Sequence, residues 1–130
     1  MAVFAHALIV DDARFMRCVL IDALTPLCGA IAEAADLDAA LHQARRQPMD
    51  LVTVDLAIDT DEMVQGLELI RALKQEALAR YMVVVSAIDQ EWVREATRDA
   101  GASAYIPKPF AIEDLRRRLR HLVEVDHAGQ

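Results

Sequence analysis

Short apolar runs alternate with amphipathic segments along the whole chain. Several of the runs are continuous rather than interrupted by polar residues, which is typical of strands buried on both faces of a sheet. We predict five strands on this basis: Ala7–Val10, Ala30–Ala34, Leu51–Val54, Met82–Val85 and Ala104–Ile106.

The segments that follow these runs carry apolar residues at spacings of three and four, the period of an amphipathic helix. Their stripes are Met16, Val19, Leu20 and Ala23; Leu37, Ala40, Leu41 and Ala44; Leu67, Ile70, Leu73 and Leu78; Trp92, Val93 and Ala96; and Leu115, Leu119 and Leu122. A strand–helix alternation repeated five times indicates an α/β fold, with a parallel sheet covered by helices on both faces.

Residues that cap or end helices fall near the predicted boundaries. Pro26 is expected to end or kink the first helix, because proline cannot continue the backbone hydrogen-bond ladder. Gly29 and Gly101 follow predicted helix ends, where a left-handed cap is common. Asp36 and Asp89 stand where helix N-caps are expected.

Composition and charge narrow the class of protein. The 130 residues, 55% of them hydrophobic, fit one domain that buries roughly two-thirds of its unfolded surface. We expect this domain over residues 1–125 and a tail over 126–130. The net charge of −7 argues against direct nucleic-acid binding, and no apolar stretch reaches the ~18 residues of a membrane span. The two cysteines lack zinc-type spacing, which favours a reduced, cytoplasmic compartment.

Polar residues of three kinds follow the predicted strands. Asp11 and Asp12 end the first strand, Asp55 follows the third, Ser86 follows the fourth, and Lys108 follows the fifth. In an open parallel α/β sheet, functional groups gather beyond the carboxyl ends of the strands. We therefore expect three carboxylates, a hydroxyl and an ammonium at one edge of the sheet.

A cluster of hard oxygen ligands suits Mg²⁺, which would offset the repulsion among the carboxylates. A carboxylate held beside a divalent cation and a lysine is also a nucleophile toward phosphorus. Each residue alone has a structural alternative: Asp11–Asp12 as a turn and N-cap, Ser86 as a capping residue, and Lys108 as a solvated side chain. Their joint occurrence at strand ends favours a functional site.

Four segments together resemble the response-regulator receiver domains of bacterial two-component signalling: "LIVDDARFMR", "DLVTVDLA", "VVVSA" and "AGASAYIPKPF". The resemblance covers Ala7 to about Val123. It implies a flavodoxin-like, doubly wound five-stranded sheet in the order 2-1-3-4-5. It also implies a cis peptide bond between Lys108 and Pro109.

The same resemblance implies the role of each site residue. Asp55 would accept a phosphoryl group from a histidine kinase or a phosphotransfer protein. Mg²⁺ would be held by Asp12 directly, Asp11 mainly through water, Asp55, and the backbone carbonyl of Ala57.

A conformational switch is the second implication of the resemblance. Ser86 would be the switch hydroxyl, Lys108 the lysine that pairs with the phosphoryl group, and Tyr105 the aromatic switch residue. A downstream protein would bind the face formed by the fourth helix, fifth strand and fifth helix. Trp92 and Phe110 are candidate contacts there, although plain packing is the simpler explanation for Phe110.

Two departures from the family pattern stand out. In "DLAIDTDEMVQG", Gly66 follows Asp55 by eleven residues rather than the usual eight, and Asp59–Glu62 makes the expected loop acidic. That loop is interpreted as a solvated surface segment, or as an altered metal entrance or partner contact. Ala57 and Ile88 stand where polar side chains often guide water to the phosphoryl group.

Two other functions remain open from the sequence. One is a pseudo-receiver, an interaction module that is never phosphorylated. The other is a Mg²⁺-dependent aspartyl phosphohydrolase, although such enzymes need an acid/base two residues after the nucleophile, where this chain has Ala57. Because Ala57 stands at the acid/base position, we expect a regulatory domain rather than an enzyme acting on other substrates.

The basic run Arg116–Arg118 with Arg120 might suggest DNA binding. We interpret it instead as the solvated face of the last helix.

Overall fold

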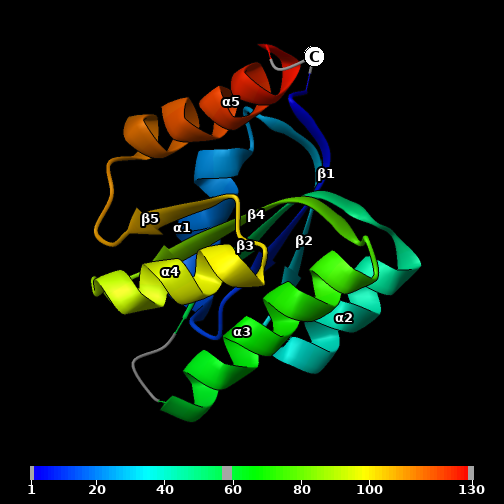
Figure 1. Ribbon diagram of the computed structural model, residues 1–130. Coiled ribbons are helices and arrows are strands. Elements are labelled where there is room, and N and C mark those ends of the chain that lie inside the picture. Colours follow the sequence, from blue (N-terminus) through cyan, green and yellow to red (C-terminus); the bar gives the residue numbers. More distant parts are fainter. Residues whose placement is uncertain (1, 57–59, 129–130) are drawn as a thin grey trace.

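The computed structural model describes residues 2–56 and 60–128 of the chain, with side chains described for 2–56 and 63–126. Strands and helices alternate in the described part (Figure 1). The strands are β1 (Phe4–Val10), β2 (Cys28–Ala34), β3 (Met49–Val54), β4 (Ala79–Ser86) and β5 (Ala104–Pro107). The helices are α1 (Arg14–Leu24), α2 (Leu37–Arg46), α3 (Thr60–Gln75), α4 (Glu91–Ala100) and α5 (Ile112–Ala128).

The strands form one sheet in the order β2-β1-β3-β4-β5, and every pairing is parallel. Helices α2, α3 and α4 cover one face of the sheet, and α1 and α5 cover the other (Figure 1). This arrangement confirms the predicted flavodoxin-like fold. It also brings the ends of β1 and β3 next to each other at the centre of the sheet.

Each face of the sheet carries its own apolar core, because successive residues of a strand point to opposite sides. Toward α2, α3 and α4 the core contains Leu8, Val52, Val54, Val84, Leu69, Ile70 and Leu73, among others. Toward α1 and α5 it contains Ile9, Leu51, Val83, Val85, Leu20, Leu24, Leu115 and Leu119, among others. Most residues of the predicted helix stripes therefore supply the inner surfaces of both layers, whereas Trp92, predicted in the stripe of α4, is exposed.

Three of the predicted helix boundaries are confirmed. Helix α1 ends at Leu24, just before Pro26. The Asp36 side chain caps α2 by accepting a hydrogen bond from the backbone N–H of Ala39 at 2.8 Å. Gly101 ends α4 with a φ of 129°, a conformation that favours glycine.

Two predicted caps are wrong. Gly29 lies within β2, where an added Cβ would meet the backbone oxygen of Ala5 at 2.9 Å, so the close approach of β1 explains the glycine. Asp89 precedes the N-cap of α4, which is Gln90. The Asp89 carboxylate instead accepts a hydrogen bond from the Arg94 guanidinium at 2.7 Å.

The ends of α3 and α5 also differ from the expectation. Asp61 and Glu62 lie in the first turn of α3 rather than in a loop, while Asp59 lies outside the described residues. Leu78 follows the end of α3. Helix α5 continues to Ala128, and Asp126 accepts a hydrogen bond from the Tyr81 hydroxyl at 2.7 Å, so the helix packs on β4 past the expected boundary at residue 125.

The buried hydroxyl of Thr53 leads to a testable prediction about stability. It is fully buried in β3, and its hydroxyl is the one buried side-chain polar atom with no hydrogen-bond partner in the described part of the chain. Removing an unsatisfied buried group relieves a desolvation cost of roughly 1–3 kcal/mol. We expect Thr53→Val to raise the free energy of unfolding by about 1 kcal/mol or more in urea denaturation.

A matched variant separates the hydroxyl from the methyl group of Thr53. Thr53→Ser keeps the hydroxyl and removes one buried methyl group, so its free energy of unfolding should fall by about 1 kcal/mol. A Thr53→Val protein that is no more stable than the wild type would show that the hydroxyl finds a partner in solution.

Within the described residues, no helix has the length and apolar character that crossing a membrane requires.

Candidate functional site

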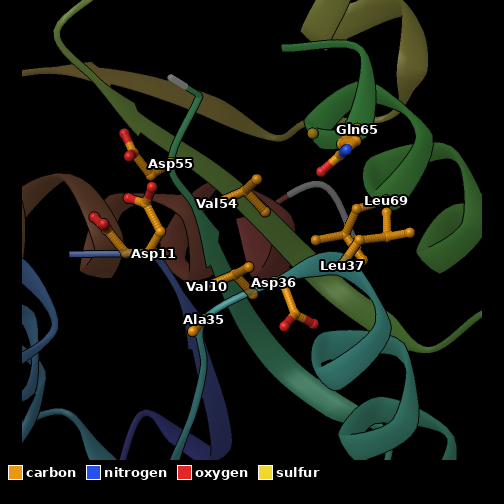
Figure 2. Close-up of a pocket in the computed structure, with 11 residues that line it drawn as sticks. Val10, Asp11, Ala35, Asp36, Leu37, Val54, Asp55, Gln65 and Leu69 are labelled. Carbon is orange, nitrogen blue, oxygen red and sulfur yellow. The ribbon is translucent and has the colours of Figure 1, made fainter. Parts of the chain in front are cut away.

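The predicted carboxylates meet at the carboxyl ends of β1 and β3. The backbone N–H of Asp11 donates to Ala34 of β2 at 3.1 Å, and that of Asp55 donates to Val10 of β1 at 3.0 Å. These bonds continue the ladder past the strand ends and bring the two aspartates together. One carboxylate oxygen from each of Asp11, Asp12 and Asp55 lies within 4.8 Å of the others. Figure 2 shows Asp11 and Asp55 at one side of the cavity that they line.

Lys108 joins this cluster from the segment that follows β5. Its ammonium nitrogen lies 3.1 Å from Asp55 Oδ1 and 3.3 Å from Asp11 Oδ2, and its side chain is only 17% exposed. The backbone N–H of Lys108 donates to the Ser86 carbonyl at 2.8 Å, which ties its segment to the end of β4. The peptide bond between Lys108 and Pro109 is cis, as predicted.

Asp11 is held on all sides, whereas Asp12 is open. The Asp11 side chain is 1% exposed, and its Oδ1 accepts a hydrogen bond from the backbone N–H of Ala13 at 2.9 Å. The Asp12 side chain is exposed at the mouth of the site. The Asp11 carboxylate is therefore held in place by its hydrogen bonds, and the Asp12 carboxylate remains accessible to a ligand.

The environment opposes ionisation of Asp55. Burial is the main cause that raises the pKa of its carboxyl above the ordinary value of 3.8, and the neighbouring Asp11 raises it further. Lys108 acts in the opposite direction, by charge and by hydrogen bonding, and Asp12 adds a smaller upward contribution. One ammonium thus compensates the carboxylates only in part.

The residues fit a magnesium ion. Two ligands on opposite sides of Mg²⁺ stand about 4.2 Å apart, since each bond is 2.0–2.1 Å. One oxygen from each of the three carboxylates lies within 4.8 Å of the others, which is close enough for a single cation to be shared among them. A cavity of about 170 Å³ adjoins the carboxylates and offers space for the waters that Mg²⁺ usually keeps. Ala57, whose carbonyl was assigned to the metal, lies outside the described residues.

Ser86 is fully buried and lies against the segment that follows Asp55. Its hydroxyl donates to the Leu56 carbonyl at 2.9 Å and accepts from the Ile88 N–H at 3.1 Å. These two bonds link the end of β3 with the segment between β4 and α4. The alternative that Ser86 caps the following helix is wrong, because Ser86 is the last residue of β4 and the N-cap of α4 is Gln90.

Tyr105 is buried and linked to the same segment. Its hydroxyl donates to the Ile88 carbonyl at 2.5 Å, and the Arg94 guanidinium stacks 4.7 Å from its ring centre. Trp92 is 58% exposed on α4. Phe110 is half-buried and packs against the α1–α5 core, in agreement with the packing explanation.

Two arginines that were not predicted to have a structural role donate hydrogen bonds to backbone carbonyls, one beside the site and one at the end of α1. Arg17 of α1 donates to the Asp11 carbonyl at 2.7 Å and to Glu33 of β2 at 3.0 Å. Arg116, which was assigned to a solvated face, donates to the Ala23 carbonyl at the end of α1 at 2.8 Å. Arg17 could have been noticed as a basic residue in the helix that directly follows the acidic pair.

Comparison with known proteins gives the family. The family model for the response regulator receiver domain matches residues 7–120. The KDP operon transcriptional regulatory protein KdpE of Escherichia coli (strain K12) is 36% identical over 115 residues, which cover 88% of this chain and 49% of KdpE. The response regulator MprA of Mycobacterium leprae is 34% identical over 116 residues, 89% of this chain and 50% of MprA. The chain thus spans about half the length of these curated relatives.

Solved structures agree with this result. A response regulator from Thermotoga maritima superposes with a TM-score of 0.81 at 27% identity, covering 92% of this chain and 98% of that one. The chemotaxis protein CheY4 of Vibrio cholerae superposes with a TM-score of 0.79, covering 91% and 98%; at 21% identity it supports the fold alone. With the sequence motifs, the strand order and the match over residues 7–120 in agreement, the chain belongs to the response-regulator receiver domains of two-component signalling.

Proposed function

We propose that this domain is a phosphoacceptor switch that takes a phosphoryl group on Asp55 from a histidine kinase or phosphotransfer protein. The observation that carries the proposal is the position of Asp55 beside Asp11 and Lys108, with its carboxylate 3.1 Å from the ammonium. Membership in a regulatory family supports the same conclusion. We propose no catalytic turnover of other substrates.

The transfer is a displacement at phosphorus. One carboxylate oxygen of Asp55 forms the new bond, and the bond from phosphorus to the donor histidine nitrogen breaks, with its electron pair remaining on the imidazole. Bound Mg²⁺, held by Asp12, Asp55 and indirectly by Asp11, would supply positive charge for the phosphoryl oxygens. Lys108 is already beside the Asp55 carboxylate and would bind a phosphoryl oxygen there. The closely held Asp11 keeps Lys108 oriented throughout.

A chain of hydrogen bonds supports a switching role for Ser86 and Tyr105. The Ser86 hydroxyl must release the Leu56 carbonyl in order to donate to a phosphoryl group. The same hydroxyl holds the Ile88 N–H, and the Ile88 carbonyl holds the Tyr105 hydroxyl. Movement of Ser86 would therefore shift the segment between β4 and α4 and change the environment of Tyr105. The proposed readout surface for a downstream protein is the face formed by α4, β5 and α5.

Magnesium binding provides a direct test of the metal assignment. A ligand that binds only the folded state at ten times its Kd stabilises that state by about 1.4 kcal/mol. We expect Mg²⁺ at that concentration to raise the free energy of unfolding of the wild type by this amount, measured by urea denaturation. Asp12→Asn removes an assigned direct ligand and should lose most of the gain.

Two comparisons make this test specific. The same ionic strength supplied as NaCl controls for general screening of the acidic chain. Equal stabilisation of the wild type and Asp12→Asn by Mg²⁺ would place the ion elsewhere and contradict the metal assignment.

A further inference from the structure

The peptide group between Asp11 and Asp12 is held by a side chain outside the assigned site. The Arg17 guanidinium donates from Nη1 to the Asp11 carbonyl at 2.7 Å, a distance typical of a strong, charge-assisted hydrogen bond. Its Nε donates to Glu33 of β2 at 3.0 Å. The Arg17 side chain is 16% exposed, whereas that of Glu33 is 45% exposed.

The Asp11 carbonyl lies just beyond the last residue of β1. Asp11 follows the last residue of β1, and its N–H is held by Ala34 of β2. The Arg17 guanidinium donates a hydrogen bond to this carbonyl. Because the pair with Glu33 is half-exposed, its own contribution to stability is small, and the bond to the carbonyl is the more consequential contact.

Planarity connects this bond to the metal ligands. The Asp11 carbonyl and the Asp12 N–H belong to one rigid peptide unit, so a donor that fixes the oxygen also fixes the direction in which Asp12 leaves that plane. The Asp11 carboxylate is already tied to Ala13 and Lys108. Arg17 therefore acts on the Asp12 carboxylate, which is exposed and makes no hydrogen bond or ion pair with the described residues.

We propose that Arg17 is a positioning residue that orients the Asp11–Asp12 peptide and thereby presents the Asp12 carboxylate to Mg²⁺. This inference rests on the proposed function, which assigns Mg²⁺ to this site. Mg²⁺ demands nearly ideal octahedral geometry, so a misdirected ligand lowers its affinity. Residues that orient metal ligands typically change affinity by roughly 10–100-fold.

The direction in which the Kd for Mg²⁺ changes when Arg17 is replaced distinguishes a positioning role from an effect of its charge alone. A guanidinium close to the acidic cluster repels a divalent cation, so deletion of its charge alone would tighten Mg²⁺ binding. Loss of positioning would weaken it. The two explanations therefore predict opposite changes in Kd for the same substitution.

The test measures Mg²⁺ binding by isothermal titration calorimetry, without phosphorylation. We expect Arg17→Met to raise the Kd about tenfold, and Glu33→Gln, which keeps the carbonyl bond, to leave it within about twofold of the wild type. At saturating Mg²⁺, Arg17→Met should be phosphorylated by acetyl phosphate at nearly the wild-type rate. If Arg17→Met does not fold, Arg17→Gln is judged by the same criterion, since its side chain is polar but too short to span both partners.

The results that would overturn the inference are distinct from those that concern the proposed function. An unchanged or lower Kd in folded Arg17→Met, or an equal loss in Glu33→Gln, would refute positioning by Arg17 while Mg²⁺ binding by the wild type stands. A wild type that binds no Mg²⁺, or an Asp12→Asn protein that binds it equally well, would remove the metal assignment itself and the inference with it.

Discussion

Asp55→Asn should abolish phosphorylation of the domain by acetyl phosphate. An amide has no anionic oxygen to attack phosphorus, and the Asp55 carboxylate is the one assigned to phosphorus beside the Lys108 ammonium, at 3.1 Å. Intact-mass spectrometry after incubation with Mg²⁺ and acetyl phosphate measures the effect. Labelling of Asp55→Asn at the wild-type level would show that the phosphoryl group is carried elsewhere.

Stability provides the control for that variant. Folding raises the pKa of Asp55, mainly by burial, so the folded state favours the protonated carboxyl. The contribution of the Asp55 carboxyl to the free energy of unfolding is fully present below its ordinary pKa of 3.8. This contribution is lost as the pH rises through the higher pKa of the folded state. Without Mg²⁺, Asp55→Asn should therefore be more stable than the wild type at pH 7, and the difference should vanish below pH 3.8. A loss of labelling by a variant with these properties cannot be ascribed to unfolding.

The phosphorylated wild type should lose its phosphate slowly, and Ala57→Asn and Ile88→Glu should each accelerate the loss about tenfold or more. Water must attack phosphorus in line with the departing Asp55 oxygen, and a side chain that orients this water contributes substantially to the rate. Neither Ala57 nor Ile88 can hydrogen-bond through its side chain. The half-buried Ile88 side chain packs against the core under α2, α3 and α4, so it brings no polar group to the site.

The acidic segment Asp59–Glu62 offers the main alternative source of a group that guides water. Release of inorganic phosphate from purified phosphoprotein should be followed for the wild type, the two variants above and Asp59→Ala. A wild type that releases phosphate as fast as Ala57→Asn and Ile88→Glu would refute the argument. A marked slowing in Asp59→Ala would then identify the Asp59 carboxylate as the responsible group.

Most of the fold and the centre of the site follow from local sequence features. Continuous apolar runs such as Met82–Val85 specify strands buried on both faces, and the three- and four-residue stripes specify the helices that cover them. Parallel strands place their carboxyl ends at one edge of the sheet, and the pairing of β1 with β3 then brings Asp11 and Asp55 together. The strand order and the cis bond at Lys108–Pro109 came from the family resemblance instead.

The features that were not predicted depend on contacts between distant elements. Gly29 resembles a helix cap in sequence, but the approach of Ala5 on the adjacent strand determines its position. Arg17 and Glu33 are ordinary surface residue types, and only the packing of α1 beside β2 gives them a common role. Asp89 pairs with Arg94 five residues later instead of capping α4, a choice between two local contacts that composition does not decide.

The most direct test of the central claim is the intact mass of the wild-type domain after incubation with acetyl phosphate, with Mg²⁺ and with EDTA in parallel. We expect the mass to rise by one phosphoryl group in Mg²⁺ only, and hydroxylamine to remove it, because an acyl phosphate is cleaved by that nucleophile. No added mass, or an adduct that forms equally in EDTA or resists hydroxylamine, would contradict phosphorylation of an aspartate and leave the domain as an interaction module.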